Sequence, residues 1–442
     1  MKKLLLALLL AALAAAGVAG ALWYREQTEE KVVRGSPTVE FVSTDAPGTT
    51  MRAKREVRRL PWPMYAYDRA RTHFAPEFRH RPPYRRLWSF ETGAYIEFPP
   101  AVADNRLYVA NQRGEFIALW AGKGKVSWRR SFHRCIAAGP AIAGGLVYMA
   151  VMNPIPCERS NRAAQRGFVI AMDAETGKTR WRRDIGVTES SPLVVDKYVY
   201  VGSWDHKVYA LDARTGRVRW SYDAGEEVNS AVAYASGTVF IGGDGGHVFA
   251  LNAWTGKLRW RASAFARFGR REYFYSTPAV AYGRVYIGNT DGTLYAFGAR
   301  SGRLLWASTA GTYVYTGPAV WRNRVYVGSY DGYFSAFDAA TGDRVWRWSA
   351  PGAIHGAPTV LAGLVYFSTT SGGIATAKAQ RYIKVGRRGT YALDARTGKL
   401  VWRMPRVGTY SPIVADERRV YLTGATRVYG LQPKKAKGKS KS

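Results

Sequence analysis

Val208-Tyr-Ala-Leu-Asp-Ala-Arg-Thr-Gly-Arg-Val-Arg-Trp220 is the stretch that decides the fold, because related copies of it recur along the chain. The copies end in tryptophan and follow one another at a spacing of roughly 40 residues, with some insertions. A period of this size indicates a repeat architecture in which each unit is one supersecondary element. The other copies occupy residues 116–128, 169–181, 248–260, 294–306, 334–346 and 390–402, and a degenerate last copy ends at Leu431.

The unit from Pro318 to Trp346 shows why each copy predicts four strands. Pro318 opens a short apolar strand, at a position where no N–H is needed for a ladder. The next strand, at residues 325–328, is β-branched and aromatic. Asp331-Gly332 forms a hairpin turn, because this pair tolerates positive φ, and residues 338–342 form a second turn. Four antiparallel strands joined by tight turns make one blade of a β-propeller.

The number of first strands predicts an all-β, eight-bladed β-propeller of four-stranded blades. First strands begin near residues 100, 140, 192, 231, 278, 318, 358 and 412. The last unit lacks its fourth strand, and the segment from Arg85 to Gly93, which contains Trp88, is expected to supply it and to close the ring. Closure removes the exposed edge that an open array would leave. Seven blades with a stray N-terminal strand is the rival count.

The N-terminus carries a targeting signal. Lys2 and Lys3 precede an uncharged run from Leu4 to Tyr24, which is long enough for the roughly 20 residues that cross a bilayer. The lysines predict that the propeller lies on the extracytoplasmic side of a membrane. The segment is a signal anchor, a single-pass transmembrane helix, or a signal peptide that is cleaved near residues 18–20 to give a secreted protein. The expected plan is residues 1–24 signal, 25–58 linker, 59–84 lead-in segment packed on the propeller, 85–432 propeller and 433–442 basic disordered tail.

The charge balance favours anionic partners. The chain has 65 Lys and Arg residues against 32 Asp and Glu residues, which gives a net charge of +33. Phospholipid headgroups, an anionic wall polymer or nucleic acid would be attracted, with nucleic acid the least favoured of the three. A solvated basic surface without a specific partner explains the charge equally well.

Cys135 and Cys157 are the only two cysteines, and export predicts that they form a disulfide; two reduced thiols are the alternative.

Motifs of known enzyme classes are absent from the sequence. The six histidines lack the spacing of a HExxH metal pair, and no Gly-x-Ser-x-Gly elbow is present. We therefore predict no catalytic residue and no metal site.

The loops that enter each first strand converge at one face of a propeller, where pockets form. Three residues before the opening proline, the loops carry Glu97, Glu189, Tyr275, Tyr315 and His355, while Asn229 and Tyr410 fall one place later. These side chains predict an axial site for a polar ligand or a cation, or alternatively a hydrated channel lining. A longer loop before Tyr275 is rich in the residue types of protein interfaces and is the predicted partner contact, with Arg267, Arg270, Arg271, Tyr273 and Phe274.

The repeat Ala-Leu-Asp-Ala-x-Thr-Gly-x-x-x-Trp, seen at Ala210–Trp220 and Ala392–Trp402, resembles the tryptophan-docking motif of quinoprotein (pyrroloquinoline quinone, PQQ) β-propellers. The lead-in Trp62-Pro63-Met64 is also similar, so the resemblance covers residues 60 to 432. It implies that each docking tryptophan stacks on a neighbouring blade and has a structural role. These residues are Trp88, Trp128, Trp181, Trp220, Trp260, Trp306, Trp346 and Trp402.

The resemblance implies one of two functions. Some members are PQQ-dependent dehydrogenases, which hold the quinone and Ca²⁺ over the axis and have a disulfide between adjacent cysteines that this chain lacks. Others are cofactor-free scaffolds, such as the propeller lipoprotein of the outer-membrane assembly machine, whose lipidated cysteine is also missing here. We expect a membrane-anchored, non-catalytic scaffold or recognition module that binds protein partners and no cofactor. The alternatives are a PQQ- and Ca²⁺-dependent dehydrogenase using Glu97 or Glu189, and a binder of an anionic polymer or nucleic acid.

Overall fold

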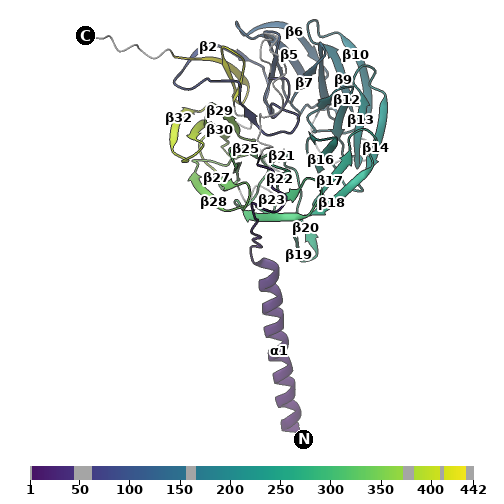
Figure 1. The fold of residues 1–442 in the computed structure, drawn as a ribbon, viewed down its shortest axis with the longest axis vertical. Coiled ribbons are helices and arrows are strands. Elements are labelled where there is room, and N and C mark those ends of the chain that lie inside the picture. Colours follow the sequence, from purple (N-terminus) through teal and green to yellow (C-terminus); the bar gives the residue numbers. More distant parts are fainter. Residues whose placement is uncertain (1, 44–61, 156–165, 372–382, 409–412, 435–442) are drawn as a thin grey trace, which may run out of the picture.

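The computed structural model describes residues 2–43, 62–155, 166–371, 383–408 and 413–434. Within these residues, eight antiparallel blades of four strands stand around a central axis (Figure 1). The short strand β1 (Phe74–Ala75) adds to one blade in parallel, and β19 (Ala266–Arg267) and β20 (Arg270–Arg271) form a separate hairpin. One helix, α1 (Lys2–Thr28), precedes the propeller.

Each blade runs from its innermost to its outermost strand. Blades 1 to 4 are β3 (Ala101–Ala103), β4 (Arg106–Ala110), β5 (Glu115–Trp120) and β6 (Lys125–Ser131); β7 (Ala141–Ala143), β8 (Leu146–Val151), β9 (Arg166–Asp173) and β10 (Thr179–Gly186); β11 (Leu193–Val195), β12 (Tyr198–Gly202), β13 (Lys207–Asp212) and β14 (Val218–Asp223); and β15 (Ala233–Ala235), β16 (Thr238–Gly242), β17 (His247–Asn252) and β18 (Leu258–Ser263). Blades 5 to 8 are β21 (Ala279–Ala281), β22 (Arg284–Gly288), β23 (Thr293–Gly298) and β24 (Leu304–Thr309); β25 (Ala319–Trp321), β26 (Arg324–Gly328), β27 (Tyr333–Asp338) and β28 (Arg344–Ser349); β29 (Thr359–Leu361), β30 (Leu364–Thr369), β31 (Gly389–Asp394) and β32 (Leu400–Pro405); and β33 (Ile413–Ala415), β34 (Val420–Thr423), β35 (Arg427–Pro433) and β2 (Tyr84–Glu91).

The turns form as the sequence predicts. Gly332 and Gly342 have φ angles of +81° and +76°, which a side chain would disfavour. Between β27 and β28, the Asp338 carboxylate accepts hydrogen bonds from the backbone N–H groups of Ala340 and Thr341 at 2.9 and 3.1 Å. This local hydrogen bonding stabilises the turn that starts the fourth strand.

The ring closes between the first and last strands of the propeller. The strand β2 pairs antiparallel with β35, with Trp88 opposite Gly430 and Phe90 opposite Val428. β2 is therefore the outermost strand of blade 8, although it precedes blade 1 in the chain. The prediction of eight blades closed by the segment around Trp88 is confirmed, and the rival count of seven is wrong.

Docking tryptophans join each blade to the next. In seven cases, the indole N–H donates to the backbone carbonyl of an alanine in the following blade's third turn. The pairs are Trp88–Ala121 (3.1 Å), Trp128–Ala174 (3.0 Å), Trp181–Ala213 (2.9 Å), Trp220–Ala253 (2.9 Å), Trp260–Ala299 (3.0 Å), Trp306–Ala339 (3.0 Å) and Trp346–Ala395 (3.3 Å). Each indole also lies against the glycine of that turn; a Cβ on Gly216, for example, would lie 2.5 Å from the Trp181 ring.

Trp402 is docked differently from the other seven tryptophans. The third and fourth strands of blade 8 come from opposite ends of the propeller sequence, so no turn joins them. Trp402 therefore has no such turn to dock on, and its ring instead makes an edge contact with Tyr84, with the ring centroids 5.3 Å apart. The Tyr84 hydroxyl also lies 2.8 Å from that of Tyr366 in blade 7. A tyrosine of the closing strand thus takes the place of the turn.

The lead-in segment runs through the central channel and contacts the innermost strands. Its backbone hydrogen-bonds in turn to Val102, Ile142, Tyr234, Val280, Val320 and Val360. The buried Arg71 guanidinium adds bonds to the carbonyls of Ser191, Pro192 and Val232, at 3.1, 3.1 and 2.9 Å, and to that of Tyr65. One short segment therefore links six of the eight innermost strands to one another and also contacts the loop that enters the innermost strand of blade 3.

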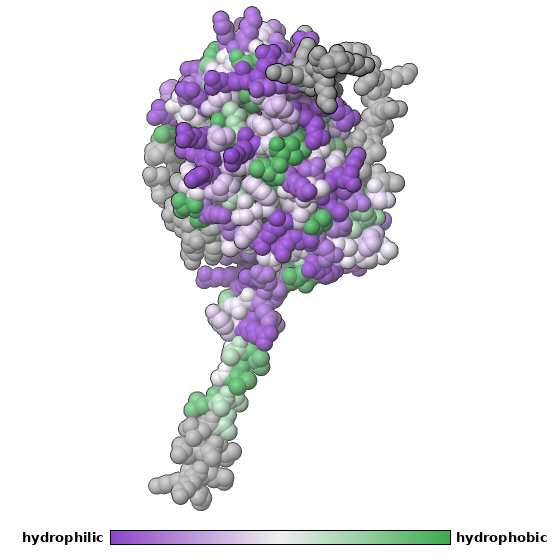
Figure 2. All heavy atoms as spheres, turned by 90° about the vertical axis from the view of Figure 1, so that its left-hand side faces the viewer, coloured by the Kyte–Doolittle hydropathy of each residue, from purple (hydrophilic) through white to green (hydrophobic). Residues whose placement is uncertain are grey.

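The N-terminal helix projects from the rim of the ring, beside the β19–β20 hairpin (Figure 1). Apolar side chains cover the middle of the helix, whereas its end next to the propeller and most of the propeller face in the same view are hydrophilic (Figure 2). Among the residues described, no helix combines the length and hydropathy needed to span a bilayer. The transmembrane helix therefore stays a prediction.

Residues 29–43 connect the helix to blades 5 and 6. Val33 forms a β-bridge with Ala307, and the Phe41 ring stacks on Tyr282 with centroids 5.2 Å apart. The buried Arg284 guanidinium holds this segment through the carbonyls of Ser36, Val39 and Glu40, at 2.8, 2.6 and 3.1 Å. Part of the expected linker is therefore packed on the propeller rather than free of it.

Candidate binding site at the propeller axis

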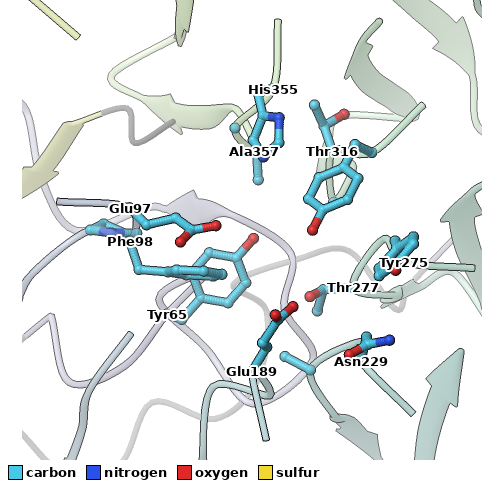
Figure 3. A pocket seen from close by; sticks show the side chains of 15 residues that line it. Tyr65, Glu97, Phe98, Glu189, Asn229, Tyr275, Thr277, Thr316, His355 and Ala357 are labelled. Atoms are coloured by element: carbon cyan, nitrogen blue, oxygen red, sulfur yellow. The ribbon is translucent and has the colours of Figure 1, made fainter. Parts of the chain in front are cut away.

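A small cavity of about 60 Å³ lies at the axis, where the loops before the innermost strands converge (Figure 3). Six of the seven predicted axial residues line it, and each precedes the first residue of an innermost strand by four positions. They are Glu97, Glu189, Asn229, Tyr275, Tyr315 and His355. The equal spacing explains why residues from six blades meet at one point. Tyr410 lies outside the described residues.

The register of Asn229 differs from the sequence prediction. The sequence predicts that Ala231 is the counterpart of the prolines that open the other first strands. This alignment places Asn229 one position later in its loop than Glu97 and Glu189 are in theirs. In the structure, β15 begins at Ala233, so Val232 occupies the proline position and Asn229 aligns with Glu97 and Glu189. The Asn229 amide donates to the Asp244 carboxylate at 2.7 Å, while its buried Oδ1 has no hydrogen-bond partner among the described residues.

Two carboxylates give the cavity its charge. Glu97 accepts a hydrogen bond from the Gln112 amide at 3.0 Å. The oxygens of Glu97, Glu189 and Tyr65 point toward the same space (Figure 3). Burial raises the pKa of Tyr315 well above its usual value, and Glu189 and other nearby groups raise it further, so this phenol stays neutral. The cavity is therefore a locally acidic and aromatic site in a strongly basic protein.

His355 does not neutralise these carboxylates. Burial lowers its pKa to about 3, so the imidazole is neutral at pH 7. Its Nδ1 lies in hydrogen-bond contact with the Tyr330 hydroxyl, and its ring lies 4.4 Å from that of Tyr315. Tyr315 in turn stacks on Tyr275 with centroids 5.1 Å apart. Aromatic side chains from blades 5, 6 and 7 thus form one continuous stack at the mouth.

The lead-in segment contributes to the cavity, and the sequence prediction of the site missed it. Tyr65 lines the cavity, and burial raises the pKa of its hydroxyl to about 12. Its ring lies 5.6 Å from the Arg71 guanidinium, whose pKa burial lowers to about 10, so that the guanidinium remains charged at neutral pH. Phe98 and Thr277 also line the cavity. The one signal for Tyr65 was its place directly after Trp62-Pro63-Met64.

The size and donor set of the cavity limit what it can hold. A cavity of about 60 Å³ admits a few water molecules or the end of one side chain. Pockets for drug-sized ligands and cofactors measure about 300–1,000 Å³. Within the part of the chain that the structure describes, no group of three or more His, Cys, Asp and Glu residues has the arrangement to hold a metal ion. The residues present therefore do not fit a quinone with Ca²⁺.

The predicted partner-contact loop forms the β19–β20 hairpin and the segment after it. Arg270 and Arg271 are exposed, and Arg267 and Tyr273 are half-buried. Phe274 is a correction: its ring is 0% exposed and packs in the core against Tyr295 and Phe297, so it cannot contact a partner. Phe268 at the hairpin tip, which the prediction left out, is 48% exposed.

The cysteine prediction is not tested. Cys135 is buried beside the innermost strand of blade 2. Cys157 lies outside the described residues. Their disulfide stays a prediction.

The comparisons with known proteins agree with the fold. The family model described as "Outer membrane protein assembly factor BamB" matches residues 84–153, 159–290, 208–315 and 290–439. No curated protein matches the chain. Among solved structures, BamB from Moraxella catarrhalis is 19% identical with a TM-score of 0.63, over 79% of this chain and 100% of that one.

Dehydrogenases share the same fold. A europium-containing methanol dehydrogenase is 16% identical with a TM-score of 0.67, over 84% of this chain and 98% of that one. A quinohemoprotein alcohol dehydrogenase from Comamonas testosteroni is 14% identical with a TM-score of 0.68, over 89% of this chain and 84% of that one. At these identities the structural likeness shows the fold alone. The family match is what places the protein, because it covers most of the sequence: the chain belongs to the family described as outer membrane protein assembly factor BamB.

Proposed function

We propose that the protein is a non-catalytic, membrane-tethered interaction scaffold whose axial face binds a protein partner on the extracytoplasmic side. The observation that carries this proposal is the axial cavity of about 60 Å³, which is lined by Tyr65 of the lead-in segment and by the aromatic stack of Tyr275, Tyr315 and His355. A cavity of this size suits one side chain of a partner. Tyrosines beside charged groups are typical of the residues that dominate protein interfaces.

The acidic cavity also selects the chemistry of the partner. Glu97 and Glu189 line the cavity, and the neutral imidazole of His355 adds no positive charge to it. A lysine or arginine from the partner would place its charge near both carboxylates and its aliphatic stem against Tyr275 and Tyr315. The proposed contact is therefore a basic side chain of a partner protein inserted at the axis.

The membrane tether is supported by the end of α1. Trp23 and Tyr24 lie against Phe268, with ring centroids 5.5 and 5.9 Å apart, and the Phe268 backbone N–H donates to Gln27 at 2.9 Å. Aromatic residues next to an apolar helix, flanked by arginines, are typical of a membrane–water interface. This arrangement would hold the propeller beside the bilayer with its axial face open to solvent. Alkaline carbonate extraction of membranes tests the tether: the full chain should stay with the lipid, and its release into the supernatant would contradict it.

Photo-cross-linking tests the axial contact. We would replace Tyr275 with p-benzoylphenylalanine, irradiate intact cells and identify the adducts by mass spectrometry. The matched control is Tyr198, which pairs with the last residue of β11 and so lies at the opposite end of its blade. The proposal predicts a distinct protein adduct from position 275 that Glu97→Gln with Glu189→Gln abolishes. The same adducts from both positions, or none from 275, would contradict it.

A further inference from the structure

A second and larger depression lies between blades 6 and 7. It is a groove of about 1340 Å³, bounded by the ends of β28 and β32 and by residues 384–388. It shares no lining residue with the axial cavity. The groove and the axial cavity are therefore separate sites.

The lining of the groove is cationic and contains no carboxylate. Its charged residues are Lys384, Arg387, Arg388, Arg403 and Arg406. Across the described ranges of the chain, none of these five lies within ion-pair distance of an Asp or Glu. The groove therefore gathers five positively charged side chains that have no carboxylate partner among the described residues.

In blades 1 and 2, the equivalent arginines have carboxylate partners. Arg129, directly after the docking tryptophan of blade 1, lies 3.5 Å from Glu115, and Arg182 of blade 2 lies 2.7 Å from Asp184. Arg403 occupies the same position after Trp402. The register places Gly389 where Glu115 would be and Pro405 where Asp184 would be. Blade 7 thus lacks both of the acidic residues that neutralise this position in blades 1 and 2.

The segment that carries Lys384 and Arg387 is fixed to blade 6. The Arg387 backbone N–H donates to the Pro351 carbonyl at 2.9 Å, and the Lys384 N–H donates to the Tyr330 carbonyl at 2.8 Å. The Lys384 ammonium also donates to the Ala350 carbonyl at 2.9 Å. The cations are therefore held on a defined backbone, which lowers the entropy lost when a ligand binds.

Apolar side chains lie among the cations. The half-buried Trp348 ring packs 5.4 Å from Tyr391, and Leu400 is 45% exposed. In the register of β31 and β32, Tyr391 pairs with Arg403. Burial raises the pKa of Tyr391, and a hydrogen bond with Thr369 and the charges of Arg403 and Arg387 partly oppose the shift. A ligand for this groove must therefore combine negative charge with apolar groups.

The outer strand of blade 7 offers a backbone edge. β32 pairs only with β31 among the described strands, so the backbone groups on its other edge are available. Extended peptides bind such edges by strand addition, and arginine forks bind carboxylates in pairs. We propose that the groove binds an extended acidic peptide segment of a partner protein, with its carboxylates on Arg387, Arg403 and Arg406 and its backbone along β32.

The test is fluorescence anisotropy with a fluorescein-labelled peptide of alternating glutamate and valine, added to the full-length protein. The variant R387Q/R403Q/R406Q should bind the peptide at least about tenfold more weakly. The control R214Q/R217Q/R300Q removes the same charge from exposed turns and should change the affinity by less than about twofold. Equal weakening in both variants would show general electrostatic attraction and overturn the proposal.

Two further experiments test whether the peptide backbone pairs with β32 and which class of ligand the groove binds. Methylation of alternate peptide nitrogens should weaken binding by about tenfold if the peptide adds to β32. Unchanged binding of the methylated peptide would overturn the strand-addition geometry. Inorganic polyphosphate is the competing ligand: if it binds through the same three arginines while the peptide does not bind, the groove is a phosphate site and the proposal is wrong. Circular dichroism melts of both variants should match that of the wild type. This control distinguishes a loss of peptide binding from a loss of folding.

Discussion

The indole nitrogen of Trp88 donates a hydrogen bond to the backbone carbonyl of Ala121, 3.1 Å away, and this contact joins the closing blade to the first one. Trp88 belongs to the strand that precedes the propeller in the chain yet completes its last blade. The bond therefore depends on correct closure of the ring. Trp402, docked on the other side of blade 8, contacts the Tyr84 ring instead.

This difference predicts unequal effects of the same substitution. Trp88→Phe removes a partly buried hydrogen-bond donor and should lower the free energy of unfolding by about 1 kcal/mol beyond the loss of ring area. Trp402→Phe removes ring area without a docking hydrogen bond and should cost less. Urea denaturation of both variants checks the prediction. Equal losses would show that the indole hydrogen bond does not stabilise closure.

The buried Arg71 should be among the most sensitive positions of the chain. Arg71→Met leaves the carbonyls of Ser191, Pro192 and Val232 without their donor inside the channel. We expect the free energy of unfolding to fall by about 3 kcal/mol or more, because unsatisfied buried polar groups cost about 1–3 kcal/mol each. The neighbouring Arg69 is a matched control, since it makes an exposed ion pair with Asp196 at 3.5 Å. Arg69→Met should cost under about 1 kcal/mol, and a similar cost for both would contradict the structural role of Arg71.

Two buried histidines predict acid sensitivity. Burial lowers the pKa of both His73 and His355 from 6.5 to about 3. Between these values the unfolded chain binds protons that the folded chain does not, so stability should decrease as pH falls from about 6.5 toward 3. Each histidine adds a slope of up to about 1.4 kcal/mol per pH unit. Asp68 acts in the opposite direction, because burial raises its pKa to about 6.

Variants separate these contributions. His355→Gln should flatten the dependence of the free energy of unfolding on pH between 6.5 and 3, whereas His206→Asn, at an exposed turn, should leave its slope unchanged. Urea titrations at several pH values measure the slope. A slope that His355→Gln does not alter would mean that the imidazole is solvated in the folded protein.

The repeat predicted most of the fold, since its turn residues and docking tryptophans are local signals. Trp88 was recognised as the closing strand because the last unit lacked a tryptophan of its own. The axial residues followed from their equal distance to the first strands. Asn229 was misaligned because Val232 replaces the proline that marked the other blades.

Other features could not be predicted because they depend on which segments meet in space. Phe274 looked like an interface residue in an aromatic loop, but the chain turns its ring into the core. Tyr65 reaches the axial cavity only through the path of the lead-in segment. The basic groove joins Trp348, Arg387 and Arg403 from separate strands, and nothing in the local sequence around any one of them indicates the others.

The central claim is that the axial site receives a partner's side chain and not a quinone. The most direct test is equilibrium dialysis of the purified full-length protein against PQQ with Ca²⁺, followed by dye reduction with alcohol substrates. The account predicts no retained quinone absorbance and no reduction, since the cavity of about 60 Å³ cannot admit the cofactor. Stoichiometric retention of the quinone with dye reduction, lost in Glu97→Gln or Glu189→Gln, would contradict it.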